Sequence, residues 1–357
     1  MEGSQANFSP LSSCSRYIQY KMIKYKVNIR CNTYNHEKYI VSALDGFTRQ
    51  STNFPFIAII VDDASTDDNE RVIKEYFESN FHQIDDPDWP SETSSAFSYI
   101  GRHNTNHNCY FLLYFLKYNH YKIGKRKAQY FSKLESSTEY SAFCEGDDYW
   151  LDPEKLQKQV NYLDTHPEYS MCFHAVKECF EGRPHLDKIR SIIEDRDYSG
   201  LEWYQNRPAQ FASFMIRSWI RGSELYETVI ADRGFIATDV PLLLTCAHYG
   251  KIRGMSDVMS VYRHNETGWT QKKHSKESII RIAESELHYE VFGEEFKSQG
   301  ESFYCLALVR VFFNTIVARD KSVDYDYVKL AWRKSKRKTI KSFFILANKL
   351  SKKYLKV

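Results

Sequence analysis

In the segment EGDDYW at residues 145–150, three carboxylates stand within four residues, with a glycine between them. Carboxylates this close repel one another, and each raises the pKa of its neighbours. A bound divalent cation relieves that repulsion, and hard cations such as Mg2+ or Mn2+ prefer oxygen ligands. The alternative is a solvated acidic turn that caps a helix. We favour a metal site, because the segment follows an apolar run and precedes a helix signal.

Two further acidic positions lie next to a predicted strand end or helix start. The apolar run FIAIIV at 56–61 ends in DDASTDD at 62–68, and Asp239 stands directly before the helix signal VPLLL. Residues 62–68 could form only a helix N-cap through Ser65 or Thr66, but a cap does not need two acids at a strand tip. Asp239 could likewise be an N-cap with proline at the helix start. We favour a ligand role for the first and a catalytic role for the second.

The elements around these acids alternate between strand and helix patterns. Residues 25–31 and the apolar runs at 56–61 and 140–144 read as strands, and helical spacing follows each of them. This order predicts an α/β fold with a central, mostly parallel sheet, in which ligands bind at the carboxyl ends of the strands. The polar stretch 78–108 reads as an inserted loop. Further strands are predicted at 109–116, 171–176, 211–216, 251–255 and 259–263.

Composition and charge restrict the class of protein. The chain has 357 residues, 42% of them apolar, and no apolar run of about 18 residues that would span a membrane. Its eight cysteines lack metal-ligand spacing, so we expect reduced thiols in a cytoplasmic protein. Residues 329–357 carry eleven Lys/Arg and no acid, whereas the first 328 residues carry a net charge of −8. Such a tail predicts contact with an anionic membrane surface, unless it is a solvated helix pair; we expect no nucleic-acid partner.

Taken in order, the motifs of residues 27 to about 270 resemble those of glycosyltransferase family 2, whose members have the GT-A fold. The first predicted strand ends in Thr33-Tyr34-Asn35, the VDDASTD turn follows, and EGDDYWLDPEKLQKQ stands where the family has its D-x-D motif. Asp239 before a helix and the later Tyr262-Arg263-His264 element also match. The resemblance implies an inverting hexosyltransferase that uses a nucleotide-diphosphate sugar, usually a UDP-sugar, together with Mn2+ or Mg2+.

The resemblance also implies a role for each matching residue. Thr33 and Asp63, with Asp62 beside it, would contact uracil and ribose, and Glu145 would face the ribose. Asp147 would be the principal metal ligand, with Asp148 close by, and Asp239 would be the catalytic base. The nucleotide-sugar site would be completed by Tyr34, Asn35, Arg126 and Arg263, and the metal site by His264.

Some of these assignments have open alternatives. Arg126 could lie in a solvated basic turn, and His264 could be a buried, hydrogen-bonded histidine. The sequence departs from the family pattern in the glutamate at 145, one methylene longer than aspartate, and in the long interval between Asp63 and Asp147.

We expect three parts: a loose N-terminal extension at 1–25, a GT-A domain at 26–275 with an insertion at 78–118, and a helical C-terminal region at 276–357 with its basic tail at 329–357. The acceptor would be a glycan or a lipid-linked glycan at the inner membrane face, in the synthesis of a bacterial surface polysaccharide. A sugar-nucleotide nucleotidyltransferase is the second reading, although residues 27–40 lack the Gly/Lys-rich phosphate loop that it needs. A non-catalytic sugar-nucleotide-binding protein at the membrane surface is the third; Asp147 and Asp239 together argue against it.

Overall fold

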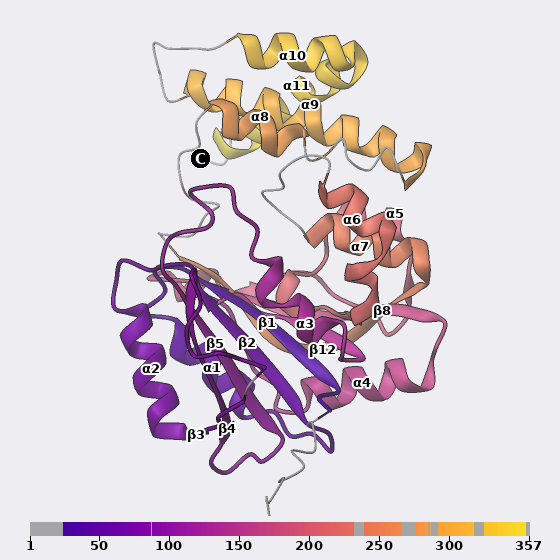
Figure 1. Cartoon of the computed structure of the whole chain (residues 1–357). Helices are drawn as coiled ribbons and strands as arrows, with labels where there is room; N and C mark the ends of the chain where they lie inside the picture. Colours follow the sequence, from indigo (N-terminus) through magenta and orange to yellow (C-terminus); the bar gives the residue numbers. More distant parts are fainter. Residues whose placement is uncertain are drawn as a thin grey trace, which may run out of the picture.

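The central feature of the computed structural model is a mixed sheet with helices on both faces, and a layer of C-terminal helices lies beside it (Figure 1). The structure describes residues 24–86, 88–231, 239–265, 276–284, 286, 292–317 and 325–354. The predicted N-terminal extension lies almost wholly outside these residues.

Four parallel strands form the centre of the sheet, in the order β6-β1-β2-β5. Every residue of β2 is buried, as expected for a strand covered on both faces. Its Phe56, Ala58 and Ile60 pack in one core and the alternating Ile57 and Ile59 in the other. The strand bounds are β1 Val27–Thr33, β2 Phe56–Asp62, β5 Cys109–Leu116 and β6 Tyr140–Phe143.

Beyond β6 the sheet becomes mixed. The short β11, Met215–Arg217, lies antiparallel between β6 and β8, Tyr169–Phe180, which in turn runs parallel to β12, Lys251–His264. The two strands expected at 251–255 and 259–263 are one strand, because register shifts between Met255 and Ser260 bend it without ending it. Small pairings complete this side through β7 Tyr149–Trp150, β9 Lys188–Ile189 and β10 Asp197–Tyr198.

The stretch expected as an inserted loop contains two strands. β3, Phe81–Gln83, and β4, Ala96–His103, form an antiparallel edge against β5. The prediction of a loop was wrong because β4 alternates buried and exposed residues, including a half-exposed Phe97, and therefore lacks a continuous apolar run.

The helices that follow the parallel strands were predicted from their periodicity. They are α1 Ile40–Thr48, α2 Asn69–Asn80 and α4 Lys155–Thr165, and α1 packs its Leu44 and Phe47 into the same core as β1. The short helices η1, Ala128–Tyr130, and α3, Ser132–Glu135, cover the other face. The remaining helices beside the sheet are α5 Gly200–Asn206, η3 Phe211–Ser213, η4 Ser218–Gly222, α6 Glu224–Ala231 and α7 Asp239–Tyr249.

The C-terminal helices form a layer with its own apolar core. Leu308 and Val309 of the long α9 pack against Ala331 and Leu346 from the two last helices. Within the part of the chain that the structure describes, no helix is long and apolar enough to cross a bilayer. The bounds are α8 Lys276–Glu284, α9 Glu294–Val317, α10 Asp326–Lys334 and α11 Lys336–Tyr354.

Candidate active site

The topology brings the predicted acidic turns to one edge of the sheet. Thr33 at the end of β1 pairs with Asp62 at the end of β2, and the Asp63 amide donates to the Thr33 carbonyl at 3.0 Å. On the other side of β1, the Gly146 amide donates to the Asn32 carbonyl at 2.9 Å. The carboxyl ends of β1, β2 and β6 therefore present their side chains together, as the parallel order predicts.

Asp62 is held by its own turn. Its carboxylate accepts the Ser65 amide at 3.0 Å, the Asn69 side-chain amide at 2.7 Å and the Ser65 hydroxyl, and the residue is 1% exposed. Burial raises the pKa of this carboxyl, and the Ser65 hydrogen bonds oppose the shift. These donors make Asp62 the anchor of the β2 turn, in which Ala64 adopts a left-handed φ of 55°.

Asp63 holds a second segment, the loop 119–127. Its carboxylate accepts the His120 amide at 2.7 Å and the Tyr121 amide at 3.2 Å, and it forms an ion pair with Lys127 at 3.0 Å. The Asn119 side chain also donates to the Asp63 carbonyl at 2.7 Å. The basic loop is thereby fixed over the ends of β1 and β2.

The residues after β1 form the facing wall. Asn35 has a left-handed φ of 57°, and its side-chain oxygen accepts the Thr66 amide at 2.8 Å. The Thr33 hydroxyl lies 3.1 Å from the Asn69 amide and 3.3 Å from His36 Nδ1. Thr33 and Asn35 thus tie the β1 turn to the β2 turn.

The turn after β6 carries three neighbouring acids, Glu145, Asp147 and Asp148. Burial raises the pKa of Glu145 to about 7; Lys127 opposes that shift and Asp147 adds to it. A Cβ at Gly146 would come within 2.7 Å of the Thr33 side chain, so only glycine fits between the two turns.

The end of β12 holds the two aspartates of this turn. The Arg263 amide donates to Asp148 Oδ1 at 2.8 Å, and the Asn265 side-chain amide donates to Asp147 Oδ2 at 3.0 Å. His36 Nε2 lies 3.8 Å from the same Asp147 oxygen. Asp148 is buried, which raises its pKa, whereas the Asp147 side chain remains 21% exposed.

The carboxylate oxygens of this turn are the type of ligand that a hard divalent cation prefers. Among the described residues no three His, Cys, Asp or Glu side chains converge as a complete ligand set. A Mg2+-type ion commonly takes one or two carboxylates and completes its shell with substrate phosphates and water. A partial protein ligand set is therefore what a substrate-bridging ion requires.

A cavity of about 810 Å3 lies between the β1 turn and the loop 119–127. This volume is in the range of small-molecule sites. Five of the predicted nucleotide-sugar residues line it, and these are Thr33, Tyr34, Asn35, Asp63 and Glu145. We call it the donor cavity, after the nucleotide-sugar donor that the sequence predicts.

The donor cavity also has lining residues that the sequence did not single out. Lys127 and Lys122 come from the basic loop, and His36 and Tyr39 come from the segment after β1. The sequence contained a signal for the lysines, because the loop is basic. The predicted Arg126 of the same loop lies 3.8 Å from Glu227 of α6 and does not line the donor cavity in this structure, so its role stays a prediction.

The remaining predicted residues lie nearby on other elements. Asp239 is the half-buried first residue of α7 and directly follows residues that the structure does not describe. The Arg263 guanidinium lies over the rings of Tyr39 and Tyr149 at 4.8 and 5.0 Å. His264 stacks on Phe180 with its Nε2 3.4 Å from Glu178, so it faces β8.

With this geometry established, the known relatives of the chain become informative. The family described as glycosyl transferase family 2 matches residues 32–87, which include both the β1 and β2 turns. This match, with the fold and the acidic edge, supports the assignment to glycosyltransferase family 2 that the motifs predicted.

Among curated proteins, the chain is similar to the uncharacterized proteins Rv1520 of Mycobacterium tuberculosis and Mb1547 of Mycobacterium bovis. Each is 32% identical over 244 residues, which cover 66% of this chain and 58% of the relative. The chain therefore spans less than two thirds of the length of these relatives.

Among solved structures, the chain is similar to S. aureus TarS, residues 1–349. That structure has a TM-score of 0.52 at 16% identity and covers 89% of this chain and 80% of the other. The complex of the same protein with UDP-GlcNAc has a TM-score of 0.53 at 16% identity, with 89% of both chains covered. The shared architecture confirms the predicted GT-A fold.

Proposed function

We propose that this protein transfers a hexose from a nucleotide-diphosphate sugar, preferentially a UDP-sugar, to a hydroxyl of a glycan or lipid-linked acceptor with inversion at C1. The observation that carries the proposal is the donor cavity, which joins Glu145 and the β1 and β2 turns at the carboxyl edge of a family 2 fold. The S. aureus neighbour was solved with UDP and with UDP-GlcNAc, which supports a uridine nucleotide.

In this proposal the nucleotide lies between the β1 turn and the loop 119–127. Thr33, Tyr34 and Asn35 form one wall, and Glu145 faces the ribose from the end of β6. Asp63 contributes by holding the loop and by positioning Lys127, whose ammonium would meet the nucleotide's negative charge.

Asp147 is the proposed holder of Mn2+ or Mg2+. When bound, the cation would neutralise the charge that develops on the departing diphosphate. Asn265 and His36 both contact Asp147 Oδ2 and so position its carboxylate. Asp148 and His264 stay predicted ligands, and each would have to exchange its present partner, the Arg263 amide or Glu178, for the ion.

The chemical step is a single displacement at C1. An acceptor hydroxyl oxygen forms the new bond to C1 as the bond from C1 to the diphosphate oxygen breaks, which inverts the anomeric centre. We assign Asp239 as the base that takes the hydroxyl proton, because it opens α7 at the place where the family has its base. Arg263 would face the diphosphate from the end of β12.

The helical C-terminal region supports the membrane part of the proposal. The outer side of α11 leaves Phe344 72% exposed and Ile340 45% exposed, and Arg337 and Lys341 are also exposed. Apolar and basic side chains on one helix suit a negatively charged lipid surface at the inner face of a bacterial membrane. Cosedimentation of the full chain with phosphatidylglycerol vesicles, but not with phosphatidylcholine vesicles, is the expected result; equal binding to both contradicts it.

The enzymatic proposal is tested by UDP release from a panel of UDP-sugars in the presence of Mn2+ and an acceptor mixture. Asp239→Asn should lower turnover by about 100-fold or more while UDP affinity stays within twofold, because only the proton transfer is removed. Full transfer activity in Asp239→Asn would exclude this residue as the base. Asp68→Asn, a change to an exposed acid of the β2 turn that does not line the donor cavity, is the matched control for a general effect of charge loss.

A further inference from the structure

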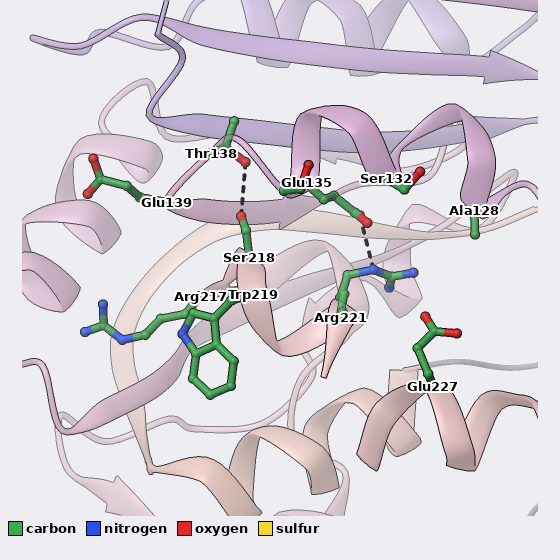
Figure 2. Close-up of a pocket in the computed structure, with 12 residues that line it drawn as sticks. Ala128, Ser132, Glu135, Thr138, Glu139, Arg217, Ser218, Trp219, Arg221 and Glu227 are labelled. Carbon is green, nitrogen blue, oxygen red and sulfur yellow. Dashed lines mark hydrogen bonds and ion pairs between the residues drawn. The ribbon is translucent and has the colours of Figure 1, made fainter. Parts of the chain in front are cut away.

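A second cavity, of about 570 Å3, lies apart from the donor cavity between η1–α3 and η4–α6 (Figure 2). In Figure 2, Ser132 and Glu135 form one wall, Ser218 and Arg221 form the facing wall, and Glu227 of α6 closes one end. We call it the second cleft. The sequence did not single out these residues.

The base of the second cleft is rigid. Glu135 pairs with two buried guanidiniums, those of Arg30 and of Arg221, the latter at 3.1 Å. Beside them the Thr138 and Ser218 hydroxyls are 3.1 Å apart and form a hydrogen bond. Side chains fixed in this way form a preformed site, which lowers the cost of ordering a ligand.

Trp219 gives the second cleft an aromatic surface. Its side chain is 52% exposed, and the indole meets Tyr249 edge to face with ring centroids 5.0 Å apart. The contact with Tyr249 holds the ring in place and leaves half of it uncovered. A large, rigid ring with one polar N–H is suited to stack on the apolar face of a sugar.

The charges around Trp219 are balanced and interspersed. Glu139 and Glu227 supply exposed acceptors, while Arg217 and Arg221 have N–H groups besides those that bind backbone carbonyls and Glu135. Glu139 lies 3.6 Å from Lys26, which compensates it. An anion would meet the carboxylates and a cation would meet the guanidiniums. A neutral ligand rich in hydroxyls can donate to the first and accept from the second.

The second cleft extends from the basic loop to the amino end of β6, where Arg217 pairs with Tyr140. Lys127 lines the donor cavity and the next residue, Ala128, lines the second cleft. Arg126 pairs with Glu227 at 3.8 Å and so joins the basic loop to α6. The helix α6 ends at Ala231, eight residues before Asp239.

We infer that the second cleft binds an oligosaccharide segment of the acceptor, with one sugar ring stacked on Trp219. This inference rests on the proposed function and adds the class of acceptor, a glycan of several neutral sugars. The sugar units that do not react would occupy the cleft, and their binding would place the reacting hydroxyl near the donor.

The test is binding of the full chain to a printed array of bacterial oligosaccharides, with UDP and Mn2+ present. The wild type should capture at least one glycan, and Trp219→Ala should lower that signal about tenfold, the usual effect of removing an aromatic anchor. Trp219→Phe should recover part of the binding. Trp332→Ala, at an exposed tryptophan of α10 that lines neither cavity, should leave it unchanged.

Two results would overturn the inference: glycans captured equally well by Trp219→Ala, or no captured glycan from wild-type protein that binds UDP. UDP affinity and thermal unfolding are measured separately on the same four proteins. Loss of folding in Trp219→Ala is thereby detected, and Trp219→Phe then decides the question. Failure of the wild type to bind UDP would count against the proposed function, which the glycan signal does not measure.

Discussion

Two acidic turns lie side by side at the carboxyl edge of the sheet, and they treat their carboxylates in opposite ways. In the turn after β2, Asp62 and Asp63 together accept hydrogen bonds from four residues, and Asp63 also pairs with Lys127. In the turn after β6, three acids adjoin one another, and the end of β12 supplies one amide to Asp147 and one to Asp148.

The difference separates structural acids from acids available to a ligand. Both turns are buried, and burial raises the pKa of Asp62 as it raises that of Glu145. The β2 turn has more protein hydrogen-bond donors to oppose this cost. The β6 turn has fewer, and a bound cation beside the donor cavity would favour the charged form of its carboxyl groups.

The largest expected effect is on stability at the β2 turn. Asp62→Ala should lower the free energy of unfolding by about 3 kcal/mol, because the buried Ser65 and Asn69 donors lose their acceptor. Urea unfolding followed by circular dichroism measures it. The control is Asp68→Ala, since Asp68 forms only an exposed pair with Arg71 and should cost less than about 0.5 kcal/mol. Equal losses in both variants would contradict the structural role.

The second expected effect concerns Lys155, the fully buried first residue of α4. Lys155 donates to Gln159 at 2.7 Å and lies over the Trp150 ring, and burial lowers its pKa to about 7. The unfolded chain, with a lysine pKa of about 10.4, binds more protons between these values, so stability should rise as the pH increases from about 7 to 10.

Lys155→Met should remove that dependence. At pH 7 the variant should be more stable than the wild type by about 2 kcal/mol, and the difference should shrink by pH 9. Thermal unfolding at both pH values measures it. A difference that stays constant with pH would show that Lys155 is charged in the folded protein throughout.

The smallest expected effect is on the loop that Asp63 holds. Asp63→Asn keeps an acceptor for the His120 amide but loses the charge that pairs with Lys127. UDP affinity should fall about tenfold, with a loss of stability below about 1 kcal/mol. Titration calorimetry with UDP measures it, and Asp68→Asn, at an exposed acid of the same turn that does not line the donor cavity, serves as the control. Unchanged affinity would show that the loop's position does not matter for the nucleotide.

Much of the fold could be predicted from local patterns. Continuous apolar runs identify β2 and β5, and acids and helical spacing after a run identify the turns before α2 and α4. The edge strand β4 was missed because one of its faces is solvated, so its pattern resembles that of a polar loop. The bulged β12 was divided because polar residues interrupt its apolar pattern.

The residues that meet at the site could be predicted from the sequence, but the hydrogen bonds and ion pairs between them could not. The order of the acidic turns indicated which residues meet at the sheet edge. Nothing local shows that Asp63 accepts the amide of His120, 57 residues away, or that Lys127 and not Arg126 reaches the donor cavity. His264 faces Glu178 because strand alternation directs it away from its neighbour Asn265.

The central claim is that Asp147, in the turn with too few protein donors, binds the cation that engages the donor's phosphates. The measurement is titration of UDP into wild type and Asp147→Asn, with and without Mn2+. We predict that Mn2+ raises the UDP affinity of the wild type at least about tenfold and leaves that of Asp147→Asn unchanged, with similar metal-free affinities. An undiminished Mn2+ effect in Asp147→Asn would contradict the claim.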